Sequence, residues 1–227
     1  MFERQGLHLA LILVLVAAVW LLGGRAASTG EFAGLTTSFW LWASLVTAVL
    51  HQAYVTLAWR AEIHHRTISA RFGRSAFILY ATVFADLAFW RVAALVGLAN
   101  ANRGVWSLPP ALVAGVTLVL GVPWVYLIYS ITRHFGWRRA LGSDHFDPVR
   151  PELVREGLWG LVENPIYTLG PLFLYLPGLW LGAPVALLAA GFQHAAIWAH
   201  WYCTEAPDME RIYGGQPDVA TSERPDV

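Results

Sequence analysis

Long apolar stretches alternate with shorter polar segments along most of the chain. They run from about Leu7 to Gly23, Leu35 to Trp59, Ala76 to Ala99 and Ala111 to Ile131. A helix rising about 1.5 Å per residue over any of these stretches is long enough to cross the ~30 Å hydrocarbon core of a bilayer. The pattern therefore predicts four membrane-spanning helices, and we expect the first to be retained rather than cleaved as a signal peptide.

A fifth apolar region, from Ile166 to Cys203, is about twice as long as one span needs to be. It is interrupted at Gly182-Ala183-Pro184, and glycine followed by proline favours a turn. We therefore expect two short spans joined as a helical hairpin. The predicted fold is an all-α, polytopic transmembrane helix bundle of about five to six spans.

The two largest polar segments, Thr132 to Asn164 and Thr204 to Val227, fall on the same side of the predicted membrane. Nearly all arginines fall on that side too, whereas Arg25 and Arg103 are on the other and Arg91 is within a span. Because positive charge accumulates in cytoplasmic loops, both termini are expected to be cytoplasmic. We interpret residues 1–214 as one transmembrane domain, and 215–227, rich in Pro, Asp and Ser, as a disordered tail.

Composition supports this interpretation. The chain has 227 residues, of which 57% are hydrophobic and 13% charged, so lipid must cover much of its surface. The 15 Lys and Arg are balanced by 15 Asp and Glu, which gives no basic excess for binding nucleic acid. All the cations are arginine, which fits a high-GC coding bias, and we expect a bacterial inner-membrane protein. The single cysteine, Cys203, excludes an intrachain disulfide framework.

Four ionisable side chains fall inside the predicted spans, namely Asp86, Arg91, His51 and His194. Such residues are costly in a bilayer and are functional candidates for that reason. The simpler interpretation is structural: Asp86 pairs within the bundle, Arg91 extends toward an interface, and the two histidines make interhelical hydrogen bonds.

The eight histidines are scattered and form no HxxxH or HxxHH cluster, so we expect no bound metal. Neither GxGxxG nor a Walker sequence occurs, which removes support for a Rossmann or P-loop nucleotide site.

The most informative stretch is Glu163-Asn164-Pro165-Ile166-Tyr167, which stands directly before the hairpin. Pro165 suits the first turn of a helix, where its missing N–H costs nothing. The free N–H groups of that helix start, with Asn164 and Tyr167, could hold the carboxylate of a cofactor. An ordinary helix cap next to the membrane would have the same sequence.

The order of segments around this stretch resembles the integral membrane methyltransferases typified by phosphatidylethanolamine N-methyltransferase and isoprenylcysteine carboxyl methyltransferase. Gly157-Leu158-Trp159 leads into Asn164-Pro165-Ile166-Tyr167, and the hairpin ends in Tyr202-Cys203-Thr204-Glu205 followed by Glu210-Arg211-Ile212-Tyr213-Gly214. Upstream, Leu141-Gly142-Ser143-Asp144-His145-Phe146 is similar to a segment of the phospholipid branch. Two details depart from the family pattern: the glycine after the tyrosine comes late, at Gly170, and Glu205 replaces an adjacent acidic pair.

The resemblance implies an enzyme that uses S-adenosylmethionine to methylate a membrane lipid, with phosphatidylethanolamine or its partly methylated derivatives as the preferred acceptor. It places the cofactor-binding part at about residues 126–214. The implied cofactor-binding residues are Gly142, Asn164, Pro165, Tyr167, Tyr202, Glu205 and Glu210. The candidate proton acceptors are Glu163, His145 and Glu205, and Arg150 and Arg155 are the candidate anchors for a lipid phosphate.

Several alternatives remain open from the sequence. An isoprenylcysteine-type carboxyl or small-thiol methyltransferase would have the same motifs. A sterol-type membrane reductase has a similar C-terminal pocket but fills it with NADPH. A non-catalytic membrane protein could use Asp86, Arg91 and His51 to line a polar path, although the chain lacks the repeated halves typical of transporters. The sequence leaves the oligomeric state undetermined.

Overall fold

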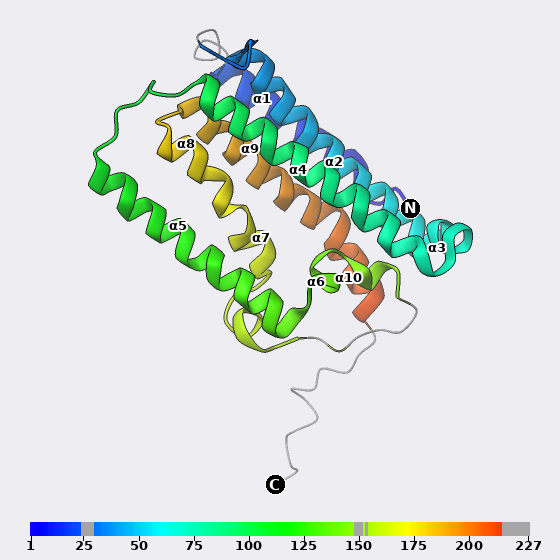
Figure 1. The fold of residues 1–227 in the computed structure, drawn as a ribbon. Coiled ribbons are helices and arrows are strands. Elements are labelled where there is room, and N and C mark those ends of the chain that lie inside the picture. The colour runs from blue at the N-terminus through cyan, green and yellow to red at the C-terminus, as the bar shows by residue number, and fades with distance from the viewer. Residues whose placement is uncertain (24–29, 148–151, 153, 215–227) are drawn as a thin grey trace.

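The computed structural model describes residues 1–23, 30–147, 152 and 154–214, and this part of the chain is almost entirely helical (Figure 1). Two very short antiparallel strands, β1 (Glu31–Phe32) and β2 (Leu35–Thr36), precede the second long helix. The helices are α1 (Gln5–Gly23), α2 (Thr37–His65), α3 (Thr67–Phe72), α4 (Ala76–Ala101), α5 (Pro110–Ser130), α6 (Trp137–Ala140), α7 (Pro165–Leu169), α8 (Leu176–Trp180), α9 (Pro184–His200) and α10 (Ala206–Tyr213). Short 3₁₀ helices cover Gly73–Ser75, Ser143–His145, Gly157–Gly160 and Gly170–Tyr175, and π-helical turns cover Ile131–Phe135 and Trp201–Glu205.

Four helical segments are long and apolar enough to span a membrane: Gln5–Gly23, Thr37–His65, Thr67–Ala101 and Pro110–Phe135. They correspond to the four apolar stretches of the sequence, so the predicted bundle is confirmed. The second helix starts after the β1–β2 turn because the Thr36 hydroxyl accepts a hydrogen bond from the Phe39 N–H at 3.2 Å. It ends where Arg66 turns into the left-handed region, at φ 52°.

The last apolar region folds back on itself where the sequence predicted a turn. Gly182 has φ +57°, and a Cβ there would lie 2.1 Å from the Trp106 carbonyl oxygen, so only glycine fits. Pro184 then begins α9, and the Asn102 side-chain oxygen accepts a hydrogen bond from the Val185 N–H at 3.0 Å. The predicted hairpin is therefore present.

The first arm of the hairpin is less regular than the second. It consists of α7, the 3₁₀ helix Gly170–Tyr175 and α8, each with a proline in its first turn. Proline lacks the N–H that a continuous helix would use, so each of these prolines starts a new segment. This arm packs against both α5 and α9, and α5 thereby lies apart from α4 (Figure 1).

Helix α9 packs against α1, α2 and α4 and lies at the centre of the largest apolar core. Its inward face is rich in alanine, including Ala186, Ala189, Ala190 and Ala196, each 1% exposed or less. Inside a bilayer the hydrophobic effect does not drive helices together, so helix association depends on van der Waals packing. Small residues strengthen this packing because they let the helices approach closely.

The charged residues inside the spans do not all behave as expected. Arg91 is buried, and its Nε donates to the Gln193 side-chain oxygen at 2.6 Å rather than extending toward an interface. Asp86 is exposed on the outer surface of α4 and forms no ion pair with the part of the chain that the structure describes. His194 does bond across the hairpin, to the Tyr175 hydroxyl at 3.2 Å, as expected, whereas His51 has no such bond to any described residue.

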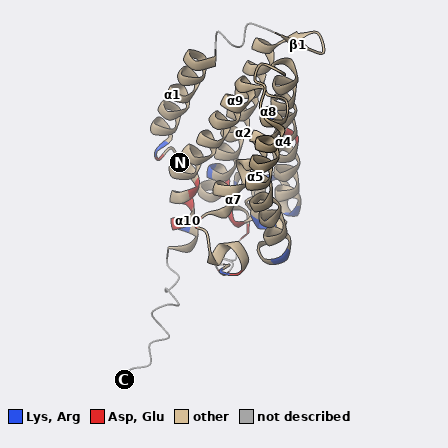
Figure 2. Cartoon of the chain, turned by 90° about the vertical axis from the view of Figure 1, so that its left-hand side faces the viewer, with Lys and Arg blue, Asp and Glu red and all other residues tan. Residues whose placement is uncertain are grey.

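Charged residues gather toward the end of the bundle that carries α10, while most of the remaining length is uncharged (Figure 2). We call this end, formed by α6, α10 and the Ser143–His145 turn, the polar end of the bundle. The chain also begins there, since Arg4 bonds to the Tyr202 carbonyl at 3.0 Å. The apolar helices together with this one-sided charge make the protein an integral membrane protein.

Candidate active site

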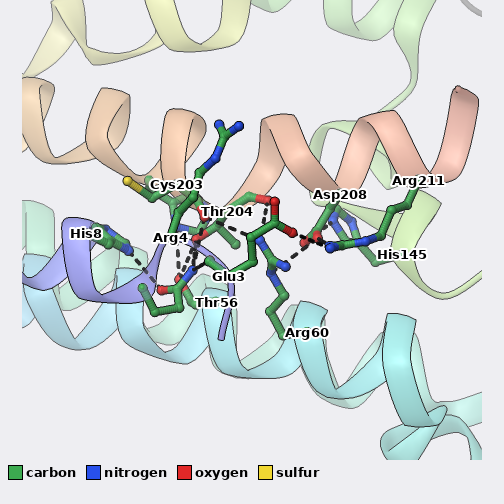
Figure 3. Close-up of polar contacts among 12 residues, drawn as sticks. Glu3, Arg4, His8, Thr56, Arg60, His145, Cys203, Thr204, Asp208 and Arg211 are labelled. Carbon is green, nitrogen blue, oxygen red and sulfur yellow. Dashed lines mark hydrogen bonds and ion pairs between the residues drawn. The ribbon is translucent and has the colours of Figure 1, made fainter. Parts of the chain in front are cut away.

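Helix α10 is fixed at the polar end by a buried carboxylate, Asp208. Its Oδ1 lies 3.2 Å from Arg60 Nε on α2 and 3.2 Å from Arg211 Nη1, and its Oδ2 lies 3.7 Å from His145 Nε2 (Figure 3). Asp208 and Arg60 are both 1% exposed or less. A buried charge is tolerated only when it is paired, so these contacts hold α2, α10 and the Ser143–His145 turn together.

The N-terminal residues close the same cluster from the side of α1. Glu3 pairs with Arg211, whose guanidinium holds the pKa of Glu3 below its usual value. The Gln5 amide donates to the Cys203 carbonyl at 3.1 Å and to the Thr204 hydroxyl at 3.2 Å. Backbone N–H and C=O groups are less well paired in the π-helical turn Trp201–Glu205 than in a regular α-helix. The Gln5 amide supplies a hydrogen-bond donor to one of these carbonyl groups.

The Ser143–His145 turn approaches α2 very closely at Trp59. Gly142 has φ +86°, and a Cβ at this position would lie 2.4 Å from the Trp59 ring. The His145 ring stacks on the same indole, with ring centroids 4.0 Å apart and planes at 14°. His145 Nδ1 also lies 3.3 Å from the Gly142 carbonyl oxygen, which fixes the orientation of the imidazole.

We expect Gly142→Ala to destabilise this turn far more than Gly104→Ala destabilises its own turn. Both glycines have positive φ, but a Cβ at Gly104 has no atom within 4 Å. Gly104→Ala therefore costs only backbone strain, whereas Gly142→Ala also displaces Trp59, at an additional ~1–3 kcal/mol. Denaturant unfolding in detergent micelles measures the difference, and equal losses for the two variants would show that the contact with Trp59 does not constrain the turn.

A cavity of about 400 Å³ extends from the polar end into the middle of the bundle. At the polar end it is lined by Asp144, His145 and Glu205, and in the interior by Arg91 and His51. Apolar and aromatic side chains of α2, α4, α5 and the hairpin form the rest of its wall, among them Val55, Phe84, Trp124, Leu127, Ile128, Phe173 and Ile197. The cavity thus joins an acidic mouth to an interior that is mainly apolar and contains Arg91 and His51.

Glu205 is the carboxyl group most altered by this environment. Burial raises its pKa to about 8, and the nearby carboxylates of Asp208 and Asp144 add to the effect. Its Oε2 is buried and has no hydrogen-bond partner in the part of the chain that the structure describes. An unpartnered acceptor that lines a cavity is suited to bind a cationic ligand.

Asp144 also lines the cavity mouth, and only one of its two carboxylate oxygens is hydrogen-bonded to described residues. Its Oδ2 accepts from the Tyr213 hydroxyl and from Arg139 Nε, the latter at 3.3 Å. Burial, together with the contact to Asp144, raises the pKa of the Tyr213 hydroxyl, so this group remains a hydrogen-bond donor. Asp144 Oδ1 is buried and has no partner among the described residues, which gives the cavity mouth a second free carboxylate oxygen.

The structure brings four of the sequence-predicted site residues to this cavity, namely Gly142, His145, Tyr167 and Glu205. Two further predicted residues, Asn164 and Pro165, position Tyr167. Asn164 adopts a left-handed conformation at φ 50°, and its carbonyl accepts from the Tyr167 N–H at 3.0 Å at the start of α7. The motif before the hairpin therefore places Tyr167 on the cavity wall.

Other predicted site residues lie away from the cavity. The side chains of Glu163, Arg155, Tyr202 and Glu210 are exposed and do not line it. Arg150 falls outside the residues that the structure describes. The roles assigned to these five residues from the sequence remain predictions.

Several residues that build the site were not predicted from the sequence. Asp208 follows Glu205 by three residues, and that spacing on one helical face could have identified it. His200 lines the cavity, with Nδ1 lying 3.1 Å from the Thr56 hydroxyl and a buried Nε2 that has no partner among the described residues. Trp59 and Arg60 come from α2, more than 80 residues earlier in the chain than His145, and no local pattern links them to the site.

Comparison with known proteins finds similarity over the same part of the chain. Residues 110–216 match the family model described as phospholipid methyltransferase. A phosphatidylethanolamine N-methyltransferase of Schizosaccharomyces pombe is 30% identical over 101 residues, which are 44% of this chain and 11% of that protein. An enzyme of the same name from Malassezia globosa is 31% identical over 104 residues, 45% of this chain and 10% of that protein.

A third phosphatidylethanolamine N-methyltransferase, from Paracoccidioides brasiliensis, is 27% identical over 118 residues, which are 52% of this chain and 12% of that protein. The chain thus aligns with only about a tenth of the length of these relatives. No solved structure matches the chain. Residues 110–216, which include α5, the hairpin and α10, thus match the phospholipid methyltransferase family model, in agreement with the resemblance that the motifs around Asn164 and Tyr167 indicated.

Proposed function

We propose that this protein transfers a methyl group from S-adenosylmethionine to the amine of a membrane phospholipid, with phosphatidylethanolamine or its partly methylated derivatives as the acceptor. The observation that carries the proposal is the cavity that joins an acidic mouth to a mainly apolar interior. A polar donor and a lipid acceptor can approach each other end to end in such a space. The family match and the names of the three relatives agree with this chemistry.

The residues at the cavity mouth fit a cationic cofactor. S-adenosylmethionine carries a sulfonium and an ammonium group, and the buried oxygens Glu205 Oε2 and Asp144 Oδ1 lack partners among the described residues. When bound, this cofactor supplies an electrophilic methyl group for in-line displacement. Tyr167 and His145 provide ring surfaces that line the same cavity. An anionic dinucleotide such as NADPH would be repelled by Asp144 and, above about pH 8, by Glu205 as well, which disfavours the reductase alternative.

A phospholipid ammonium must lose a proton before its nitrogen can attack. We propose His145 Nε2 as the proton acceptor, because it is buried, has no hydrogen-bond partner among the described residues and belongs to a side chain that lines the cavity. The Gly142 carbonyl oxygen can only accept a hydrogen bond, so His145 Nδ1 donates to it and Nε2 is left as the proton-accepting atom. The roles of the chain are then to orient the two reactants, remove this proton and exclude water.

We further propose that the polar end faces the cytoplasm and that both termini lie on that side. The one-sided distribution of arginine supports this orientation, since cytoplasmic loops are enriched in positive charge. The lipid would then enter from the cytoplasmic leaflet.

The raised pKa of Glu205 predicts that cofactor affinity depends on pH. Below about pH 8 the carboxyl is mostly protonated, and a cation has to displace that proton in order to pair with it. We expect the affinity for S-adenosylmethionine to rise by up to about tenfold per pH unit from pH 6 to pH 8 and to level off above. Calorimetry in buffers of different ionisation enthalpy should show proton release at pH 7.

The matched variant for this measurement is Glu205→Gln, which keeps the shape of the side chain but does not titrate. Its affinity should be lower and nearly constant between pH 6 and pH 8. A wild-type affinity that does not change over this range would argue against Glu205 as the cation contact.

A lipidomic comparison tests the proposed activity in cells. Expression of the protein in a host that makes phosphatidylethanolamine but no methylated derivatives should produce the monomethyl, dimethyl or trimethyl species. Glu205→Ala should strongly reduce the yield of these species at equal protein level, because it weakens cofactor binding. An unchanged phospholipid profile, together with methylation of a thiol or a carboxyl group, would favour the alternative acceptors.

A further inference from the structure

The interior end of the cavity contains a buried positive charge whose described partners are all neutral. Arg91 on α4 is 6% exposed, and it donates to the Gln193 side-chain oxygen at 2.6 Å and to the Gln193 carbonyl at 3.4 Å. The Gln193 amide in turn donates to the Ser44 hydroxyl at 2.9 Å. No carboxylate in the described part of the chain pairs with Arg91. An uncompensated guanidinium inside a membrane is expensive, so this arrangement favours an anionic ligand.

A second side chain at the same end also lacks partners. His51 on α2 is 5% exposed, and neither ring nitrogen has a hydrogen-bond partner among the described residues. Its ring is held edge-on against Phe84, with centroids 4.5 Å apart, and it lines the cavity together with Arg91. The imidazole therefore presents an unused hydrogen-bonding group next to an uncompensated cation.

The distance between the Arg91–His51 end of the cavity and its acidic mouth is long enough for the lipid headgroup and the methyl donor together. Gln193 and Glu205 are twelve residues apart along α9 and its π-helical continuation, or roughly 18 Å at 1.5 Å per residue. His200 lies between them. This interval has room for a phosphoethanolamine headgroup, the reacting methyl group and the amino-acid part of the donor, arranged in line.

We propose that Arg91 and His51 bind the phosphate of the acceptor lipid. The assignment rests on the proposed function and names the feature of the acceptor that the cavity recognises. The guanidinium pairs with the anionic phosphate oxygens, which compensates its buried charge, and His51 donates one further hydrogen bond. Both residues lie before residue 110, outside the part of the chain that matches the family model.

This assignment gives Arg91 the role that the sequence alone suggested for Arg155. Arg155 is exposed and does not line the cavity, whereas Arg91 lines it and is buried. The amine of a lipid held by Arg91 would extend toward His145 at the polar end of the cavity, so phosphate binding also positions the proton to be removed. The two assignments therefore differ in what they predict. If Arg91 binds the phosphate, a substitution of Arg91 impairs lipid binding, whereas if Arg155 binds it, a substitution of Arg155 does.

Binding can be tested without turnover. Trp59 and Trp124 line the cavity, so their fluorescence should report ligand entry in purified protein in detergent. The probes are dihexanoyl phosphatidylethanolamine, dihexanoylglycerol, which lacks the phosphate, and inorganic phosphate. We expect the phospholipid to bind at least about tenfold more tightly than the glyceride and inorganic phosphate to bind weakly. Arg91→Met and His51→Phe should each reduce that preference, and Arg91→Lys should keep part of it.

Asp86→Asn, an exposed change on the same helix as Arg91, is the control for folding and should keep the preference. The proposal is overturned if Arg91→Met and His51→Phe both keep it, or if Arg155→Ala alone removes it. Inorganic phosphate that binds as tightly as the phospholipid would overturn the lipid assignment. A chain that shows the Arg91-dependent preference but methylates no lipid would refute the proposed function and leave the phosphate site standing.

Discussion

Glu205→Ala is expected to lower the affinity for S-adenosylmethionine by about 10- to 100-fold. The change removes the carboxyl oxygen that is buried at the cavity mouth without a partner, and with it a charge-assisted contact to a cationic ligand. Hydrogen bonds to charged groups contribute about 1.5–3 kcal/mol, and each 1.4 kcal/mol corresponds to a factor of ten. Isothermal titration at pH 8.5, where Glu205 is mostly ionised, measures the effect at its largest.

Two further variants make this result specific. Glu31→Ala removes an exposed carboxylate in β1 and should leave cofactor affinity unchanged. Glu210→Ala tests the assignment made from the sequence, because Glu210 is exposed and does not line the cavity. A loss of affinity in Glu210→Ala with none in Glu205→Ala would mean that the donor binds outside the cavity.

Asp208→Ala is expected to cost about 3–5 kcal/mol of unfolding free energy, since it leaves the buried guanidinium of Arg60 without its carboxylate. Arg211 and His145 lose the same partner, so α10 should detach from α2 and from the Ser143–His145 turn. Glu205 directly precedes α10 and should lose its position as well. Unfolding by denaturant in detergent micelles should show the loss of stability, together with a weaker cofactor affinity.

An exposed ion pair provides the comparison for this variant. Arg138 and Asp147 lie 2.9 Å apart, with side chains 59% and 39% exposed. Asp147→Ala should cost under about 1 kcal/mol, because water and salt screen such pairs. The double variant Arg60→Met with Asp208→Leu should regain much of the stability lost in Asp208→Ala. No recovery in the double variant would mean that the stabilisation comes from contacts other than this ion pair.

Features that depend on local sequence were predictable. Hydropathy identified the four spans because most lipid-facing residues have to be apolar, and this constraint acts along the whole length of a helix. The break near Gly182 and Pro184 was predictable because these residue types restrict the backbone directly. The motif from Asn164 to Tyr167 likewise forms a helix start whose geometry lies in consecutive residues.

Features that depend on packing between distant segments were not predictable. Nothing in the sequence near Trp59 or Arg60 shows that α2 contacts the turn at His145 and the helix at Asp208. Arg91 was expected to reach an interface because a lone arginine in a span usually does. Its bond to Gln193 exists only because α4 and α9 pack side by side, which hydropathy does not report.

The most direct test of the proposed chemistry is methyl transfer by purified protein. The protein is placed in nanodiscs that contain phosphatidylethanolamine and is supplied with S-adenosylmethionine carrying a deuterated methyl group, and the lipids are analysed by mass spectrometry. We predict phosphatidylethanolamine species that gain one or more deuterated methyl groups on the headgroup nitrogen, and a strongly reduced yield with Glu205→Ala at limiting cofactor. Unlabelled lipids from folded wild-type protein that binds the cofactor would contradict the proposed activity.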